Sequence, residues 1–297
     1  MNTSTIERVP SWYGVGTDVS GCKNDLAAIL KKSGLDYTVS SKPVSVDGIG
    51  GAENFQAIVR DSDNKIYQIA RKSYTLCQNE DAFSLINQLD TDVSVVQAGE
   101  TANGLIYMIA KMPEVKVLND AFDPYIIFQT SHTSEYGLRM AITPLRIVCQ
   151  NQFSTAFGEC HNTQTIKHTS SIHSQIEAAN AVLTDVAHYM KDFSANAERL
   201  ASIQLPVEPA VEKLFPIPEQ ATERMMNNIE EKRERFLSIY DSEDNLNFKG
   251  TAWGFMNAAT DFITHRPIRN NNHESHFLST TINPELLKAA TSIVRNA

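Results

Sequence analysis

The pattern of apolar and polar positions divides the chain into two parts. Between about residue 12 and residue 157, short β-rich runs are separated by polar turns, which is typical of strands with a few short helices. From about residue 170 to the end, apolar residues recur every three or four positions, which indicates helices. The sequence therefore predicts an α+β fold. An antiparallel-rich β-sheet domain with flanking helices is expected over residues 1–160, followed by a mainly helical region, residues 161–297, packed against it.

Several elements of the first part have clear boundaries. A helix is expected over residues 25–35, closed by Gly34, because glycine readily takes the left-handed conformation after a helix end. Two β-rich runs, 55–60 and 66–71, surround a polar turn and predict a hairpin. A helix is expected to run from Asn79, as a capping residue, to Leu89. Further strands are expected at residues 93–97, 105–112, 125–130 and 138–149.

The last of these strands carries polar residues that need partners. Arg146 lies inside an apolar run that ends on Gln150 and Asn151, and arginine is rarely buried unpaired. We therefore expect Arg146 to point into a partly buried site and to pair with a carboxylate or a carbonyl. Pro144 implies an edge position or a bulge, because proline cannot donate to a ladder. An unbroken strand would turn Arg139 and Arg146 to opposite faces, whereas a one-residue bulge would bring them to one side.

The second part contains the strongest periodic signal, a run of nine apolar residues at alternating spacings of four and three. They are Ile172, Ile176, Ala179, Leu183, Val186, Met190, Phe193, Ala197 and Leu200. The run predicts a long helix over about residues 170–204, ended by Pro206 and Pro209. Two interpretations are open. The stripe packs inside the chain, with the helix that carries Trp253 as its natural partner, or it forms a coiled-coil seam in a homo-oligomer.

Three more helices are expected beyond that one. The first covers about residues 218–240 and presents a solvated charged face. The second covers residues 251–265, and the third begins at residues 283–285, where Asn283 precedes a proline at the first helical position.

Composition and charge narrow the function classes. With 297 residues, 42% hydrophobic and 21% charged, the chain has the composition of a soluble globular protein. Its apolar runs are too short to cross a membrane and no secretory signal is visible, so we expect a cytoplasmic protein without membrane contacts. Its cysteines (Cys22, Cys77, Cys149 and Cys160) are then free thiols. The net charge of −9 argues against coating duplex DNA, but a local basic groove is compatible with it.

One cluster of side chains has the residue types of a metal site. Cys160, His161, His168 and His173 are of the types that bind zinc. Their spacing matches no standard zinc motif, so a surface loop with incidental histidines is the simpler interpretation. No metal and no cofactor are expected.

A second cluster suggests proton transfer. Trp253, Asn257, Asp261 and His265 recur every four residues and so share one face of the helix over 251–265. An aspartate and a histidine one turn apart are able to form a proton-transfer pair. The alternative is a polar helix face whose His265 complements the dipole in the last turn. No nucleophile accompanies the pair, so an enzyme built on Asp261 and His265 is the third-ranked hypothesis.

The remaining candidates are basic, aromatic and amide side chains on the predicted strands. Single-stranded nucleic acid is bound by a positive groove with stacking aromatic rings. Residues suited to that role are Arg60, Arg71, Lys72, Tyr74, Lys111, Arg139 and Arg146, with Gln150 and Asn151 as hydrogen-bonding groups. In this hypothesis Tyr74 stacks on a base, and the cations that contact phosphates are Arg71, Lys72, Lys111, Arg139 and Arg146. The alternative is an ordinary half-exposed sheet with scattered cations.

Three segments resemble a known family. They are WYGVGT at residues 12–17, TPLRIVCQN at 143–151 and TAWGFMNAAT at 251–260, the last followed by His265. Their order is similar to that of a phage/plasmid-like family of unknown function, the domain of unknown function nine-three-two. The resemblance covers nearly the whole chain. It implies a mobile-element origin and the bacterial cytoplasm, and no established reaction. A weaker likeness of layout links the chain to phage single-strand annealing proteins.

These observations lead to a ranked set of functions. The leading hypothesis is a non-enzymatic phage or plasmid accessory protein that binds single-stranded DNA or RNA in replication or recombination. The second is a protein-interaction or host-defence-countering factor, which binds a host or phage protein with the same sheet edge and the 170–204 helix.

Overall fold

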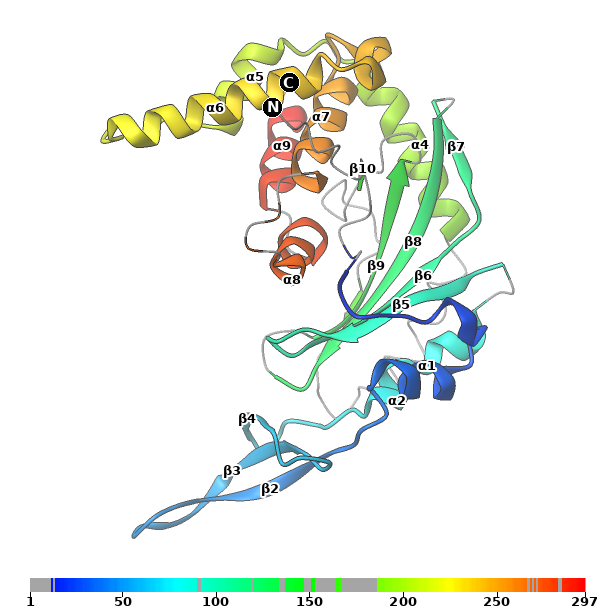
Figure 1. Ribbon diagram of the computed structural model, residues 1–297, viewed down its shortest axis with the longest axis vertical. Helices are drawn as coiled ribbons and strands as arrows, with labels where there is room; N and C mark the ends of the chain where they lie inside the picture. The colour runs from blue at the N-terminus through cyan, green and yellow to red at the C-terminus, as the bar shows by residue number, and fades with distance from the viewer. Residues whose placement is uncertain are drawn as a thin grey trace.

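The structure of the protein is a computed structural model. It describes residues 12, 14–89, 92–118, 120–133, 137–146, 151–152, 164–166, 186–265, 268, 270, 272–282 and 285–296. Within these residues the fold is α+β, with antiparallel sheets in the N-terminal half and most helices in the C-terminal half, as the sequence predicts (Figure 1).

The larger sheet is antiparallel and forms the centre of the molecule. Its strands follow the order β1-β5-β6-β8-β9-β10, with β11 also paired to β9 and β7 to β8. They are β1 (Thr17–Asp18), β5 (Ser94–Glu100), β6 (Leu105–Lys111), β7 (Val115–Val117), β8 (Asp120–Ser131), β9 (Leu138–Arg146), β10 (Asn151–Gln152) and β11 (Gln164–Ile166). Strand β6 is buried on both faces, which accounts for its uninterrupted apolar run.

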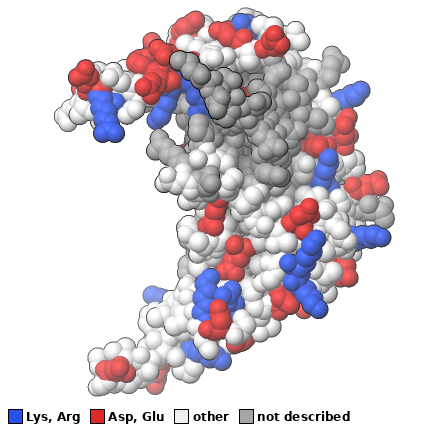
Figure 2. All heavy atoms as spheres, viewed as in Figure 1, with Lys and Arg blue, Asp and Glu red and all other residues white. Residues whose placement is uncertain are grey.

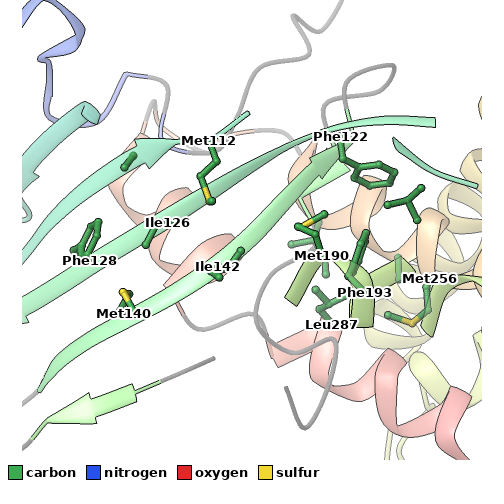
Figure 3. Packing of buried hydrophobic residues seen from close by; sticks show 14 of the residues in the cluster. Met112, Phe122, Ile126, Phe128, Met140, Ile142, Met190, Phe193, Met256 and Leu287 are labelled. Carbon is green, nitrogen blue, oxygen red and sulfur yellow. The ribbon is translucent and has the colours of Figure 1, made fainter. Parts of the chain in front are cut away.

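The two faces of this sheet are covered differently. Alternate residues of β6 pack on opposite sides: Met108 joins the large core beneath the helices, and Tyr107 joins a smaller cluster with Trp12 and Phe277. Figure 3 shows Phe122 and Ile142 of the sheet and Phe193 of the helical region within the large core. That core is one continuous cluster, so the sheet and the helices are packed against each other.

The helices are unequal in length, and several differ from the expected ones. They are α1 (Leu26–Ser33), α2 (Asn79–Ala82), α4 (Val186–Ser202), α5 (Val207–Leu214), α6 (Glu223–Tyr240), α7 (Ala252–Thr264), α8 (His273–Phe277) and α9 (Glu285–Arg295). Short 3-10 helices cover Ser20–Cys22, Ser84–Gln88 and Glu243–Phe248, and a π-helical turn covers Leu278–Ile282. The predicted helix from Asn79 is therefore a single α turn followed by a 3-10 helix.

Helix α5 is not among the elements that the sequence predicts, where Pro206 and Pro209 only end the preceding helix. Pro206 is the N-cap of α5 and Pro209 lies in its first turn. Proline is tolerated there because the amides of a first turn have no intrahelical acceptor. Two prolines therefore end α4 and begin α5 within a few residues.

The ends of α1 and α7 confirm the predictions made for them. Asp25 accepts a hydrogen bond from the Ala28 amide, and Gly34 closes α1 in the left-handed conformation at φ 71°. Thr251 caps α7 by accepting from the Gly254 amide, and His265 is its C-cap.

The register of β9 decides between the alternatives left by Pro144. Strands β8 and β9 pair without a shift from Phe122↔Arg146 to Gln129↔Arg139, with Pro124 opposite Pro144. The bulge alternative is therefore wrong, and positions 139 and 146 fall on opposite faces of the strand. Strands β10 and β11 pair with β9 on either side of Pro144, so the described strands leave the proline without a neighbour on that edge.

Helix α4 accounts for the C-terminal part of the apolar stripe. Met190, Phe193, Ala197 and Leu200 are all buried in the large core. The ring of Phe193 lies 5.4 Å from that of Phe122 and 6.0 Å from that of Trp253. These four positions therefore pack inside the chain, whereas residues 170–185 of the expected helix lie outside the described residues.

A second, three-stranded sheet projects from the main body. It consists of β2 (Val39–Val46), β3 (Gly50–Arg60) and β4 (Ile66–Arg71), and we call it the β-arm. The predicted hairpin of β3 and β4 is confirmed, but β2, which pairs along most of β3, was not foreseen. Figure 1 shows the β-arm and α6 projecting from opposite ends of the molecule, which gives the crescent outline of Figure 2.

Two glycines of the family-like segments allow close backbone approaches. A Cβ on Gly16, which has φ 69°, would fall on the Tyr107 hydroxyl and the Ala98 carbonyl. A Cβ on Gly254 of α7 would fall on the carbonyl oxygen of Phe248. These segments therefore hold elements together. In the described part of the chain, none of the helices has both the length and the apolar character needed to span a membrane.

Candidate nucleic-acid interface on the arm

The β-arm has one buried face and one exposed face. Val39, Ile58 and Ala70 lie on the inner face and form a small cluster of their own. Tyr67 and Tyr74 pack against that cluster. Side chains alternate along a strand, but the register shift of the β3–β4 pair after Ile58 interrupts this alternation in β4. Tyr67 therefore lies with the inner cluster, while Ile66 and Ile69 are exposed.

The outer face exposes large apolar side chains beside cations. Phe55, Ile66 and Ile69 are 42%, 63% and 61% exposed. Phe55 is paired across the strands with Arg71, and Ile69 and Lys42 are both paired with Ala57, one on each side of it. We call the set Lys42, Phe55, Ile66, Ile69 and Arg71 the arm face. An aromatic ring next to a guanidinium on an open sheet is suited to stacking on a base while holding a phosphate.

Arg71 and the adjacent Lys72 are available to a ligand, whereas Lys42 is paired. Among the described residues, no carboxylate lies within ion-pair distance of Arg71 or of the adjacent Lys72, and Lys42 is 4.0 Å from Asp61. Residues 37–76 carry five basic and four acidic side chains, in a chain of net charge −9. The arm itself therefore carries a net charge of +1, which is balanced by the Glu100 carboxylate that pairs with Lys65 and Arg60. Figure 2 shows basic and acidic side chains interspersed over the described surface in that view.

The base of the arm is fixed to the main sheet by a polar cluster around Glu100, which we call the junction. The Tyr37 hydroxyl donates to Oε2 of Glu100 over 2.9 Å. The Tyr67 hydroxyl lies 2.9 Å from the Tyr37 oxygen and 3.1 Å from Oε1 of Glu100. Lys65 adds an ion pair of 3.0 Å and Arg60 one of 3.5 Å. Three segments of chain therefore meet on one carboxylate.

The aromatic rings of the junction pack as closely as its polar groups. The Arg60 guanidinium lies 4.9 Å from the Tyr37 ring centroid, and the Lys65 ammonium lies 4.7 Å from that of Tyr67. Burial, with the negative charge of Glu100, raises the pKa of Tyr67 to about 12. Burial also raises the pKa of Tyr37, helped by its bond to Tyr67. Both phenols are therefore protonated at neutral pH.

Arg60 is further constrained by Asp63 in the turn between β3 and β4. Nε and Nη2 of Arg60 donate to the two carboxylate oxygens over 2.8 and 2.6 Å. This bidentate bond holds the pKa of Asp63 at about 2. Arg60, which the sequence grouped with possible phosphate ligands, is thus occupied by Asp63 and Glu100.

A second set of bonds continues the junction into the main sheet. The side chain of Asn79, expected to cap its helix, instead donates to the Leu35 carbonyl over 2.9 Å. Its oxygen lies 3.0 Å from Nε2 of the buried His132. The amide of Gln68 donates to the His132 carbonyl over 2.9 Å. Sequence reasoning missed Tyr37, Glu100 and His132, because no local pattern marks partners so far apart in the chain.

The structure separates the predicted nucleic-acid residues. Arg71 and Lys72 are exposed at the end of β4, but Tyr74 packs towards the inner cluster and burial raises its pKa to about 12. The exposed aromatic residue of the arm is Phe55. Lys111 pairs with Asp123 over 2.6 Å at the far end of the main sheet.

The other predicted contacts lie on or after β9. Arg139 is half-buried, its Nε has no hydrogen-bond partner among the described residues, and burial lowers its pKa. Arg146 and Asn151 are opposite each other in the β9–β10 pair. The side chains of Arg146 and Asn151 and the whole of Gln150 lie outside the described residues. The pairing expected for Arg146 therefore stays a prediction.

The predicted catalytic pair lies on a buried helix. Asp261 and His265 are each 9% exposed, and α7 is buried on every side. The polar face expected for this helix is therefore an interior surface. Nη2 of Arg235 donates to the His265 carbonyl over 3.2 Å and so caps the end of α7.

Cys160, His161, His168 and His173 lie outside the described residues, as does Cys149. Within the described ranges no group of three or more histidine, cysteine, aspartate or glutamate side chains is arranged to hold a metal ion. Cys22 and Cys77 are free thiols, and burial raises the pKa of Cys77 to about 12.

Comparison with known proteins gives one match. A family model described as a domain of unknown function (DUF932) matches residues 67–282, more than two thirds of the chain. The match begins in β4, so β2 and β3 of the arm precede it. Neither the curated proteins nor the solved structures contain a match to this chain.

Proposed function

The chain belongs to the DUF932 family, and we propose that it is a phage- or plasmid-encoded accessory protein that binds single-stranded nucleic acid through the arm face. The observation that carries this proposal is the cross-strand pair of Phe55 and Arg71 on an exposed sheet. The exposed part of the Phe55 ring stacks on an unpaired base, and the adjacent guanidinium reaches the phosphate that follows.

The form of the arm supports a binding role without catalysis. Two of its four carboxylates, Asp61 and Asp63, are bonded to neighbouring hydroxyls and to Arg60, whereas Asp47 and Glu53 are exposed. The junction holds the arm in a defined orientation, which lowers the entropic cost of binding. Because Phe55 lies outside the matched family range, this proposal concerns this chain and not the family as a whole.

The experiment is fluorescence anisotropy of labelled oligothymidine at low salt. Arg71→Glu should weaken binding about tenfold or more, because it replaces an attractive charge with a repulsive one. Its matched control is Lys116→Glu, the same charge change at an exposed strand residue of β7 outside the arm. Phe55→Ala should also weaken binding, whereas Ile217→Ala, at a residue of similar exposure (41%), should not. Undetectable binding by the unmutated protein rejects the proposal.

A protein partner is the second candidate, and the tip of the arm favours it. Ile49 is 85% exposed and Val46 50%, so the apolar surface continues to the end of the hairpin. This second function would be supported if the unmutated protein binds no oligonucleotide but recovers a host protein from lysate. Ile69→Asp should then abolish that recovery.

A further inference from the structure

A cavity of about 950 Å³ opens between α6, α7, α8 and α9, at the end of the molecule away from the arm. This is the size of pocket that takes a small organic ligand. Figure 1 shows α6 and α7 side by side at this end. One wall is a single face of α6, since Asn228, Glu231, Lys232 and Arg235 follow the helical spacing of three, four and seven.

One of the lining residues is a stacked and anchored arginine. Arg235 lies over the Phe262 ring at 4.5 Å, and its Nη2 donates to the carbonyls of His265 and Phe262 over 3.2 and 3.5 Å. Phe262 is itself held against Phe215 and Phe236. A planar cation fixed in this way offers a flat surface on which an aromatic heterocycle can stack.

The charge of the lining favours an anion. Lys232 lies one turn from Arg235 on the same helix, and it is exposed without an ion pair among the described residues. The carboxylate of Glu231 opposes these two cations. The amides of Asn228 and Asn270 line the cavity from two different segments and can donate and accept hydrogen bonds.

We propose that this cavity binds a free nucleotide, with the base stacked on Arg235 and the phosphates at Lys232. The amides of Asn228 and Asn270 bond to part of the base edge, and the apolar part of the lining, which includes Ile268, covers the rest. This site is independent of the arm face, since none of its residues belongs to the β-arm.

Isothermal titration calorimetry with ATP tests the site, with adenosine and sodium pyrophosphate as separate probes of its two halves. ATP should bind with a stoichiometry of about one, and more tightly than either part, because base and phosphates are recognised together. Lys232→Glu should weaken ATP binding by about tenfold or more. Lys191→Glu, an equal charge change in the middle of α4 at an exposed residue, should leave it unchanged.

The outcomes separate this proposal from the arm function. Arg71→Glu should impair oligonucleotide binding and leave ATP binding intact, so either site can fail alone. Absence of ATP binding overturns the nucleotide site. Equal affinity for pyrophosphate and ATP also overturns it, because an adventitious anion site would give that result. An ATP affinity that falls in Lys191→Glu as much as in Lys232→Glu would show a nonspecific charge effect and would overturn it too.

Discussion

The Tyr37 hydroxyl donates a hydrogen bond of 2.9 Å to the Glu100 carboxylate, although the two residues are 63 positions apart. Tyr37 precedes the first strand of the β-arm, and Glu100 ends β5 of the main sheet. This bond and those of Tyr67 and Lys65 to the same carboxylate fix the arm to the body. The position of the arm face therefore depends on one acidic side chain that is 13% exposed.

Removing that carboxylate should release the arm. Glu100→Ala leaves two phenols and the Lys65 ammonium without their acceptor, which should lower the free energy of unfolding by about 1–3 kcal/mol. Urea denaturation measures this loss. Limited trypsin digestion should also show faster cleavage after Lys65 and Arg71. Glu53→Ala, at an exposed position of β3, is the control and should change neither. Equal digestion of the two variants would contradict the role given to Glu100.

The junction should also make stability depend on alkaline pH. The pKa of Tyr67 is about 12 in the folded chain against an ordinary value of 10, so the folded state holds this proton more tightly. The resulting stabilisation is complete below pH 10 and is lost as the pH rises through 12. Tyr67→Phe should therefore make the fall in unfolding free energy between these values shallower. Parallel curves for the variant and the unmutated protein would show that the phenol titrates normally.

Salt dependence should distinguish exposed from half-buried arginines. If Arg71 contacts a phosphate, Arg71→Gln should reduce the slope of log K against log salt for oligothymidine binding by about one. Arg139→Gln tests the contact proposed from the sequence, and Lys111→Gln tests a lysine already paired with Asp123. We expect both to leave the slope unchanged, because one guanidinium is half-buried and the other cation is neutralised. An equal change for all three would favour a diffuse electrostatic interaction.

The contact between the sheet and the helices should be essential for the stability of both. Phe193→Ala empties the space between Phe122 and Trp253, and loss of a buried phenylalanine typically costs about 3–5 kcal/mol. Calorimetry should show one transition at a lower midpoint, because the sheet and the helices share one core. Lys191→Ala, at an exposed position of the same helix, should stay within about 0.5 kcal/mol of the unmutated protein. Two separated transitions would show that the two halves unfold independently.

The close approach at Gly254 should be intolerant of a methyl group. Gly254→Ala places a Cβ on the backbone carbonyl of Phe248, so α7 must move, and overpacking of this kind costs about 1–3 kcal/mol. Gly21→Ala is the control, because a Cβ there meets nothing within 4 Å. The comparison uses chemical denaturation of both variants. Equal stability of the two would mean that the helix contact adjusts without cost.

Features decided by neighbouring residues were predictable from the sequence. The caps of α1 and α7 and the hairpin of β3 and β4 each depend on residues only a few positions apart. The spacing of Met190, Phe193, Ala197 and Leu200 identified a buried helix face for the same reason, since a helix repeats its faces locally. The α+β class and the family resemblance follow from such local patterns in their order along the chain.

Only the tertiary structure decided which residues meet. Glu100 carries no local signal of its role, because its partners come from two loops and a strand that are distant from it in the sequence. The register of β9 places positions 139 and 146 on opposite faces. Tyr74 packs against the inner cluster of the arm, so Phe55 and not Tyr74 is the exposed aromatic residue. The periodicity of α7 showed that Asp261 and His265 share a face, but their burial depends on the helices around them. Local periodicity fixes the direction of a side chain relative to its own element, whereas the packing of distant elements decides what that side chain contacts.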